Sequence, residues 1–300
     1  ESVSILKDAS ATSIYGSRSS AGVIVITSKK GKYDSDTQFT YRSQIGFSQV
    51  GKTKFEMMNS SELLNFQRLV KNGKGATGGI NGVPLTDGEI SALSTVNTNW
   101  KDVFFRTGVT NTQEISMRGG TEKTRFFNSL SYFDQQGIAQ RSSLKRFTLR
   151  TNLETKTTET SLVGINLSLN YSKQNLIDSE GGLFLQNPYA AAYLASPYDA
   201  LYNPNGTLNV GINKVGANAY ENLLINQQYN NQVKAVINLF AEKQIVRNLT
   251  ARIDFGVDFS NDFFVAATDP TTQFGLTTDP GNQGSYSESS TNLGKFNTTS

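Results

Sequence analysis

From about residue 38 onward, apolar and polar residues alternate along much of the chain with a period of two. In the segment Val163–Ser172, apolar side chains hold the odd positions and polar or small residues hold the even ones. The same alternation occurs over 39–48, 146–154, 234–242 and 252–260. Successive side chains of a β-strand point to opposite faces, so each segment predicts a strand with one apolar and one polar face. Segments 112–119 and 125–134 are also predicted strands, but their mixed pattern leaves their facing open.

The connections between these strands alternate between short and long. Short turns are predicted at 120–123, 156–159 and 244–248, and long excursions at about 51–110, 135–143, 175–231 and 261–290. Several strands reach about ten residues, which is the length that a tilted strand needs to cross a bilayer. Short turns at one end and long loops at the other are typical of an outer-membrane β-barrel. A soluble β-sandwich gives no reason for this sorting of loops.

The first long excursion carries helix signals of its own. An apolar periodicity follows Asn59 and Ser60, either of which predicts an N-cap. Thr86 with Glu89 three residues later predicts a capping box and a second short helix. The glycines of 73–78 match the spacing of a dinucleotide-binding motif, but they follow a predicted helix instead of a strand. We therefore interpret 73–78 as a flexible loop on which no helix begins.

Residues 1–32 have a different pattern. Ser2–Leu6 predicts a short strand, and Asp8 predicts the N-cap of a small helix that ends at Tyr15, before Gly16. Val23–Thr27 is apolar and β-branched, which predicts a strand buried on both faces. The segment is therefore a predicted strand–helix–strand unit.

Composition narrows the classes of function. The chain contains neither cysteine nor histidine, so it has no disulfide framework and lacks the commonest metal ligand and general base. The net charge is +3 without a dense basic stripe, which argues against a nucleic-acid partner. No apolar run approaches the roughly 20 residues of a spanning helix. We predict that the protein is not an enzyme, with no catalytic, metal or cofactor site in this chain.

A family resemblance adds to this pattern. The sequence LKDASATSIYGSR at 6–18, followed by AGVIVITSK at 21–29, resembles the C-terminal plug signature of the SusC/RagA-like TonB-dependent transporters. Segments 119–124 and 132–138 resemble the early barrel hairpin of that family. The resemblance implies an all-β membrane protein: part of a large antiparallel transmembrane β-barrel preceded by the C-terminal strand–helix–strand unit of a plug domain.

The implied domains are the end of the plug over 1–32 and the N-terminal portion of the barrel over 33–300. We expect this chain to be a piece of a longer protein, because the family's signal peptide, TonB box and most of its plug and barrel are absent from it. A complete barrel of this kind has roughly 22 strands.

The resemblance also implies a function and partners. It implies TonB-dependent active import of oligosaccharides or peptides across the outer membrane of a Gram-negative bacterium. The implied partners are the TonB–ExbB–ExbD complex, a SusD-like surface lipoprotein that acts as a lid, and outer-membrane lipid. A non-transporting surface receptor or adhesin is an alternative, as are an outer-membrane hydrolase and a soluble β-sandwich binding module. The sequence names no substrate.

Two sets of residues are candidates for function. The plug signature comprises Lys7, Asp8, Tyr15, Gly16, Arg18 and Gly22. We interpret it as mainly structural, with gating as the alternative, and expect Arg18 to pair with a carboxylate of the barrel wall. The second set is Tyr189, Tyr193, Tyr198 and Tyr202, which are possible contacts for a ligand or the lid, or else pack within the loops. Trp100 is predicted to anchor either the loop or the rim. Asp254 and Asp258 are predicted to share the polar face of their strand.

Overall fold

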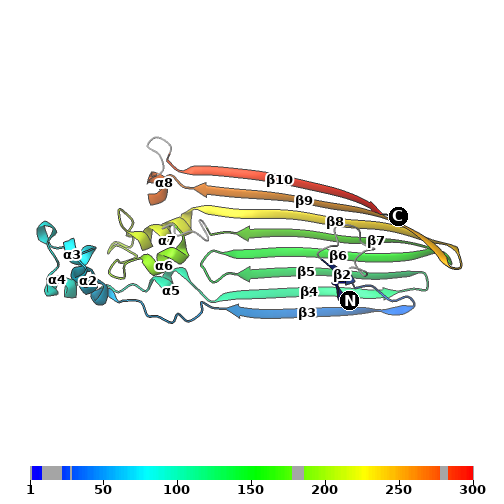
Figure 1. Cartoon of the computed structure of the whole chain (residues 1–300), viewed down its shortest axis with the longest axis horizontal. Helices are drawn as coiled ribbons and strands as arrows, with labels where there is room; N and C mark the ends of the chain where they lie inside the picture. Colours follow the sequence, from blue (N-terminus) through cyan, green and yellow to red (C-terminus); the bar gives the residue numbers. More distant parts are fainter. Residues whose placement is uncertain (1, 9–21, 28, 178–185, 278–282, 300) are drawn as a thin grey trace.

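The computed structural model describes residues 2–8, 22–27, 29–177, 186–277 and 283–299. Eight long strands form one antiparallel sheet in which neighbours in the chain are neighbours in the sheet (Figure 1). The strands are β3 (Ser35–Ser48), β4 (Gly108–Gly120), β5 (Thr124–Gln136), β6 (Ser143–Thr158), β7 (Ser161–Asn175), β8 (Gln227–Val246), β9 (Leu249–Thr268) and β10 (Ser285–Thr299). This meander confirms the strands predicted from the period of two.

The strand register gives the sheet one apolar and one polar face. Across β5 to β9, the residues Leu130, Leu149, Leu169, Ala235 and Phe259 lie side by side. One position along, the opposite face carries Ser131, Thr148, Asn170, Lys234 and Ser260. The register also resolves the facing that the sequence left open, because Ile115 pairs with Leu130 on the apolar face. Phe127 and Phe133 therefore lie on the polar face.

Short turns gather at one end of the sheet and long loops at the other (Figure 1). The turns are 121–123, 159–160 and 247–248, and the loops are 49–107, 137–142, 176–226 and 269–284. Two loops are shorter than predicted, because β8 already begins at Gln227 and β9 continues to Thr268. The backbone ladder between these strands extends past the alternating segments, into mostly polar residues in β8 and into a run of consecutive apolar residues in β9, and neither run has a period of two.

The loops carry short helices. The first loop contains α2 (Ser60–Leu69), α3 (Lys74–Thr77), η3 (Ile80–Gly82), α4 (Asp87–Leu93) and α5 (Trp100–Phe104). The later loops contain α6 (Pro188–Leu194), α7 (Val215–Ile225) and α8 (Gln273–Thr277). None of the helices in the described ranges combines the length and apolar character needed to cross a bilayer.

The predicted caps can be checked against these helices. Asn59 is the N-cap of α2 and forms a capping box with Glu62, and Thr86 forms one with Glu89 at the start of α4. Both predictions are confirmed. The loop interpretation of 73–78 was wrong, because α3 begins at Lys74. The segment still follows a helix, so it lacks the strand that a dinucleotide site requires.

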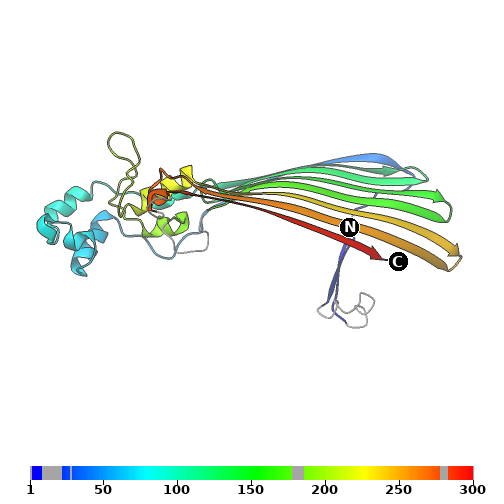
Figure 2. The same cartoon turned by 90° about the horizontal axis from the view of Figure 1, so that it is seen from above.

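At the N-terminus, β1 (Ser2–Leu6) and β2 (Val23–Thr27) form an antiparallel hairpin that stands beside one face of the sheet (Figure 2). Gly22 enters β2 with a φ of 103°, and a Cβ there would lie 3.1 Å from the carbonyl oxygen of Leu6. The prediction that β2 is buried on both faces was wrong, since Ile24 is 65% exposed. The reason is that β2 pairs only with β1 among the described strands. The predicted helix from Asp8 to Tyr15 lies almost entirely outside the described residues.

Candidate functional site

A buried carboxylate shared by two cations lies on the polar face near the turn end of the sheet. The Glu154 side chain is 3% exposed. Its Oε1 lies 2.5 Å from Nζ of Lys30, and its Oε2 accepts a 2.8 Å hydrogen bond from Nε of Arg125. Because a carboxylate is costly to bury alone, the two cations together account for its position in the wall.

The segment that joins the hairpin to β3 is held against the same part of the wall. Asn152 donates a 2.7 Å hydrogen bond from Nδ2 to the carbonyl oxygen of Lys29. The Tyr33 ring lies 4.7 Å from the Arg125 guanidinium and 4.2 Å from the Lys156 ammonium, which is within cation–π range. We call Lys30, Tyr33, Arg125 and Glu154 the junction clasp.

Gly31 explains how the segment comes so close to the wall. A Cβ at this position would overlap the carbonyl oxygens of Phe126 and Gly119. These are backbone atoms of paired strands and cannot give way as a flexible side chain would. Glycine is therefore required at the centre of the junction clasp.

Charge is distributed unevenly over the polar face. The strands β4 to β6 contribute mostly cations to it: Arg118, Arg125, Arg146, Arg150 and Lys156. Strand β9 contributes Asp254, Asp258 and Asp262. Asp254 accepts a 2.8 Å hydrogen bond from Arg252, and Asp258 lies 3.8 Å from Lys234. The prediction that Asp254 and Asp258 share the polar face is confirmed.

At the other end of the sheet, the loops 49–107 and 176–226 pack into one body, which we call the loop layer. Its core contains Trp100, Phe104, Ala191, Ala192, Ala195, Ala219 and Leu223. Trp100 is 3% exposed, lies 6.1 Å from Phe104 in a stacked arrangement and donates a 2.9 Å hydrogen bond to the carbonyl oxygen of Ser196. Of the two predicted roles, Trp100 therefore anchors the loop.

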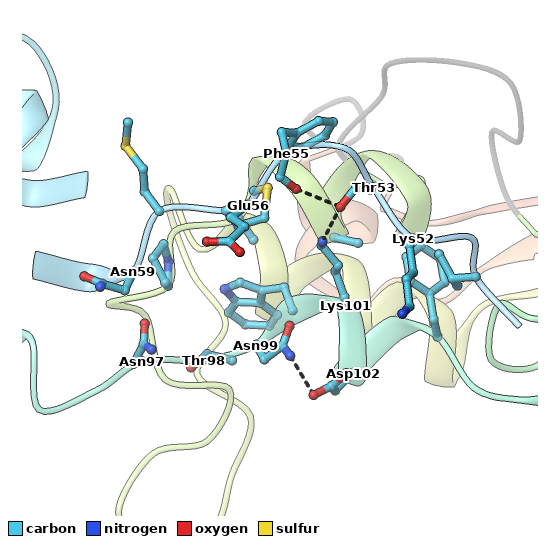
Figure 3. A pocket seen from close by; sticks show the side chains of 18 of the residues that line it. Lys52, Thr53, Phe55, Glu56, Asn59, Asn97, Thr98, Asn99, Lys101 and Asp102 are labelled. Atoms are coloured by element: carbon cyan, nitrogen blue, oxygen red, sulfur yellow. Dashed lines mark hydrogen bonds between the residues drawn. The ribbon is translucent and has the colours of Figure 1, made fainter. Parts of the chain in front are cut away.

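A cavity of about 770 Å³ lies in the loop layer between residues 49–59, α5 and the end of α6 (Figure 3). Lys101 crosses it, with Nζ 3.5 Å from Thr53 Oγ1 and 5.4 Å from the Tyr193 ring. The exposed side chains of Phe55, Met57 and Met58 add apolar surface. Amide, hydroxyl, carboxylate, cationic and apolar groups all line the cavity, and this mixture suits binding of an amphipathic ligand.

The four candidate tyrosines have different surroundings. Tyr189 packs against Phe105 at 5.5 Å, Tyr193 against Phe55 at 6.4 Å, and the Tyr198 ring lies 5.2 Å from the Lys74 ammonium. Tyr202 is 50% exposed and interacts with Tyr220, where burial first and then Tyr202 raise the pKa of the Tyr220 hydroxyl. Three of the four therefore pack within the loop layer, and their contact with a ligand or lid stays a prediction.

Of the plug signature, Lys7, Asp8 and Gly22 lie in the described residues, whereas Tyr15, Gly16 and Arg18 lie outside them. The predicted pairing of Arg18 is therefore not tested. Lys30 holds a wall carboxylate instead, a contact that sequence reasoning missed. No group of three potential metal ligands occurs in the described ranges.

Comparison with known proteins agrees with this geometry. TonB-dependent receptor SusC of Bacteroides thetaiotaomicron is 36% identical over 153 residues, which are 51% of this chain and 14% of that protein. TonB-dependent receptor P3 of Formosa agariphila is 26% identical over 266 residues, 87% of this chain and 24% of that protein. The chain thus spans a quarter or less of these curated relatives. No family model matches it.

Solved structures extend the similarity to nearly the whole chain. The RagAB peptide importer in its 'open-open' state superposes with a TM-score of 0.75 and 27% identity, over 97% of this chain and 34% of that one. The 'closed-closed' state gives a TM-score of 0.71 and 28% identity, over 91% and 33%. The similarity therefore includes the sheet and the loop layer.

A two-faced antiparallel wall with a hairpin held on its polar side defines part of a plugged β-barrel of the outer membrane of a Gram-negative bacterium. Within that class, the comparisons support a SusC/RagA-like TonB-dependent transporter. The family and fold class predicted from the sequence are confirmed.

Proposed function

We propose that the protein containing this chain imports oligosaccharides or peptides across the outer membrane by TonB-dependent active transport. The proposal is carried by the junction clasp, which holds the end of the plug-like hairpin against the polar face through Lys30, Arg125 and Glu154. A constitutively open pore has no need of such an attachment. In this proposal residues 1–32 end the plug, and residues 33–300 begin the barrel with extracellular loops.

The similarity to a peptide importer supports import in general and leaves the cargo open. We propose TonB–ExbB–ExbD as the energy source and a SusD-like lipoprotein as a lid over the loop layer. Tyr202 is the candidate for lid contact, since it is exposed at that end of the molecule. The relatives are receptors and an importer, so the proposal includes no enzymatic step.

Uptake measurements test this proposal directly. Cells lacking the gene and complemented cells, each with and without TonB, are supplied with fluorescent oligosaccharides and peptides. We expect label inside the periplasm only when both the protein and TonB are present. Surface binding without internal label, unchanged by loss of TonB, would reject import and favour the receptor or adhesin alternative.

A further inference from the structure

Near its loop end, the apolar face of the sheet carries a row of aromatic side chains. Tyr132, Phe147 and Tyr171 lie in register across β5 to β7, and the first two rings are 4.7 Å apart. Aromatic girdles mark the membrane–water interface of outer-membrane barrels, and the long loops of such barrels are extracellular. This aromatic row therefore marks the interface of the outer leaflet.

The next row toward the loops is charged. Asp134, Lys145 and Lys173 lie in register directly beyond the aromatic row on the same face. Asp134 accepts a 3.0 Å hydrogen bond from Tyr132 and lies 3.8 Å from Lys145. The Lys173 ammonium lies 5.0 Å from the Tyr229 ring. One carboxylate beside two lysines leaves a positive charge at the level of the lipid headgroups.

A cavity of about 350 Å³ adjoins this row and contains a further cation. Lys173, Asn175 and Tyr229, which all belong to the apolar-face register, line it together with Arg141. Arg141 donates through one guanidinium nitrogen to the carbonyl oxygen of Leu224, which leaves its other N–H groups for a ligand. Among the described residues that line the cavity there is no carboxylate. The site therefore suits an anion.

We propose that Arg141, Lys145 and Lys173 bind the phosphorylated headgroup of an outer-leaflet glycolipid. Arginine and lysine both pair well with phosphate oxygens, arginine through two N–H groups at once. The occupant is a lipid because Lys145 and Lys173 lie just beyond the aromatic row, on the face that the hydrocarbon covers, and Arg141 lines the cavity beside Lys173. The site would hold the barrel rim to the leaflet beside the loop layer.

The test uses the full-length protein extracted from outer membranes in mild detergent. Native mass spectrometry measures the phosphorylated glycolipid that stays bound to the wild type, Lys145→Gln/Lys173→Gln and Arg141→Gln. Lys243→Gln is the matched control, since Lys243 is exposed on the same face at the turn end. One basic side chain near a membrane surface strengthens binding about fivefold, so we expect roughly a 25-fold weaker retention in the double variant and about fivefold in Arg141→Gln.

Equal lipid retention by the wild type and the double variant would overturn the proposal. An equal loss of lipid from Lys243→Gln would also overturn it, because the effect would then be one of total surface charge. Inorganic phosphate is added as a competitor in a separate arm. Complete release of the lipid by inorganic phosphate alone would assign the cations to a free anion instead.

Discussion

Large apolar side chains are exposed on one face of the sheet but buried in the loop layer. In the sheet, Phe47 is 72% exposed and lies on the apolar face. In the loop layer, Phe104 is fully buried against Trp100. The difference shows that two solvents act on one chain: the sheet uses lipid as the partner of its apolar face, whereas the loop layer builds a core as a soluble domain does.

This comparison has consequences for stability. The sheet is held by its ladder of backbone hydrogen bonds, so removal of one outward apolar side chain leaves no cavity inside the protein. The loop layer has a small core, in which one large side chain touches several elements. A substitution in one region should therefore leave the stability of the other region unchanged.

Trp100→Ala should have the largest effect, and it should be confined to the loop layer. A Trp→Ala change in a packed core costs about 3–5 kcal/mol. Hydrogen exchange of the full-length protein should show opening of α5, α6 and α7, with the strands still protected. Phe47→Ala is the control and should change neither region by more than a small amount. Parallel loss of protection in strands and loops would contradict the separation.

Leu167→Arg tests the sheet by placing a charge in the middle of its apolar face. Arginine near the bilayer midplane of a barrel costs about 2–4 kcal/mol. Ser168→Arg is the matched control, because its side chain is the next along β7 and points to the polar face. In lipid vesicles, Leu167→Arg should clearly lower the midpoint temperature of thermal unfolding, and Ser168→Arg should lower it little. Equal shifts in the midpoint temperature would show that the two faces of the sheet are exposed to the same solvent.

Glu154→Gln tests the junction clasp, in which Lys30 and Arg125 would lose their shared carboxylate. Hydrogen bonds to charged groups contribute about 1.5–3 kcal/mol. We therefore expect the attachment of segment 29–34 to the sheet to lose about 2 kcal/mol of stability. Limited proteolysis should cut the segment 29–34 faster while the barrel stays intact. Asp258→Asn removes a more exposed carboxylate of the same face and should leave the cleavage rate unchanged.

Thr86→Ala should have the smallest effect, about 1 kcal/mol at the start of α4, through loss of an N-cap. The same capping box predicts a dependence on pH. The backbone N–H and hydroxyl of Thr86 hold the pKa of Glu89 below its ordinary value. The folded pKa is depressed, so this stabilisation is present above the ordinary glutamate pKa of about 4.3 and is lost as the pH falls through the folded pKa.

Hydrogen exchange of α4 in an acid pH series checks this dependence. Protection at the start of α4 should fall on acidification in the wild type. In Glu89→Gln it should be lower at neutral pH and flat across the same range. An unchanged pH profile in Glu89→Gln would show that another group is responsible.

The sequence predicted some parts of the sheet better than others. In β7 and β9, regular alternation predicted the strands and their faces, because lipid on one side imposes a strict period. The pattern failed in β5, where Phe127 lies on the polar face under the Lys29 ammonium, 6.0 Å away. It failed again at the loop ends of β8 and β9, where backbone pairing continues through residues that do not alternate.

The candidate site was harder to predict. The caps at Asn59 and Thr86 are local motifs, so the sequence contains all of their information. The junction clasp joins Lys30 to Glu154 across more than a hundred residues, and only the register of β5 with β6 brings Arg125 beside them. The only signal in the sequence is Gly31, which marks a close approach of backbone without naming its partner.

The most direct test of the account is the environment of alternate residues on one strand. The chain contains no cysteine, so single cysteines can be placed at Ile165, Leu167, Ile253 and Phe255, and at Asn166 and Ser168 on the other face. A fluorophore on each is then exposed to a lipid-bound quencher and a water-soluble quencher in vesicles. The account predicts that lipid quenches the first four and spares the last two. Water-soluble quenching of the first four without lipid quenching would contradict it.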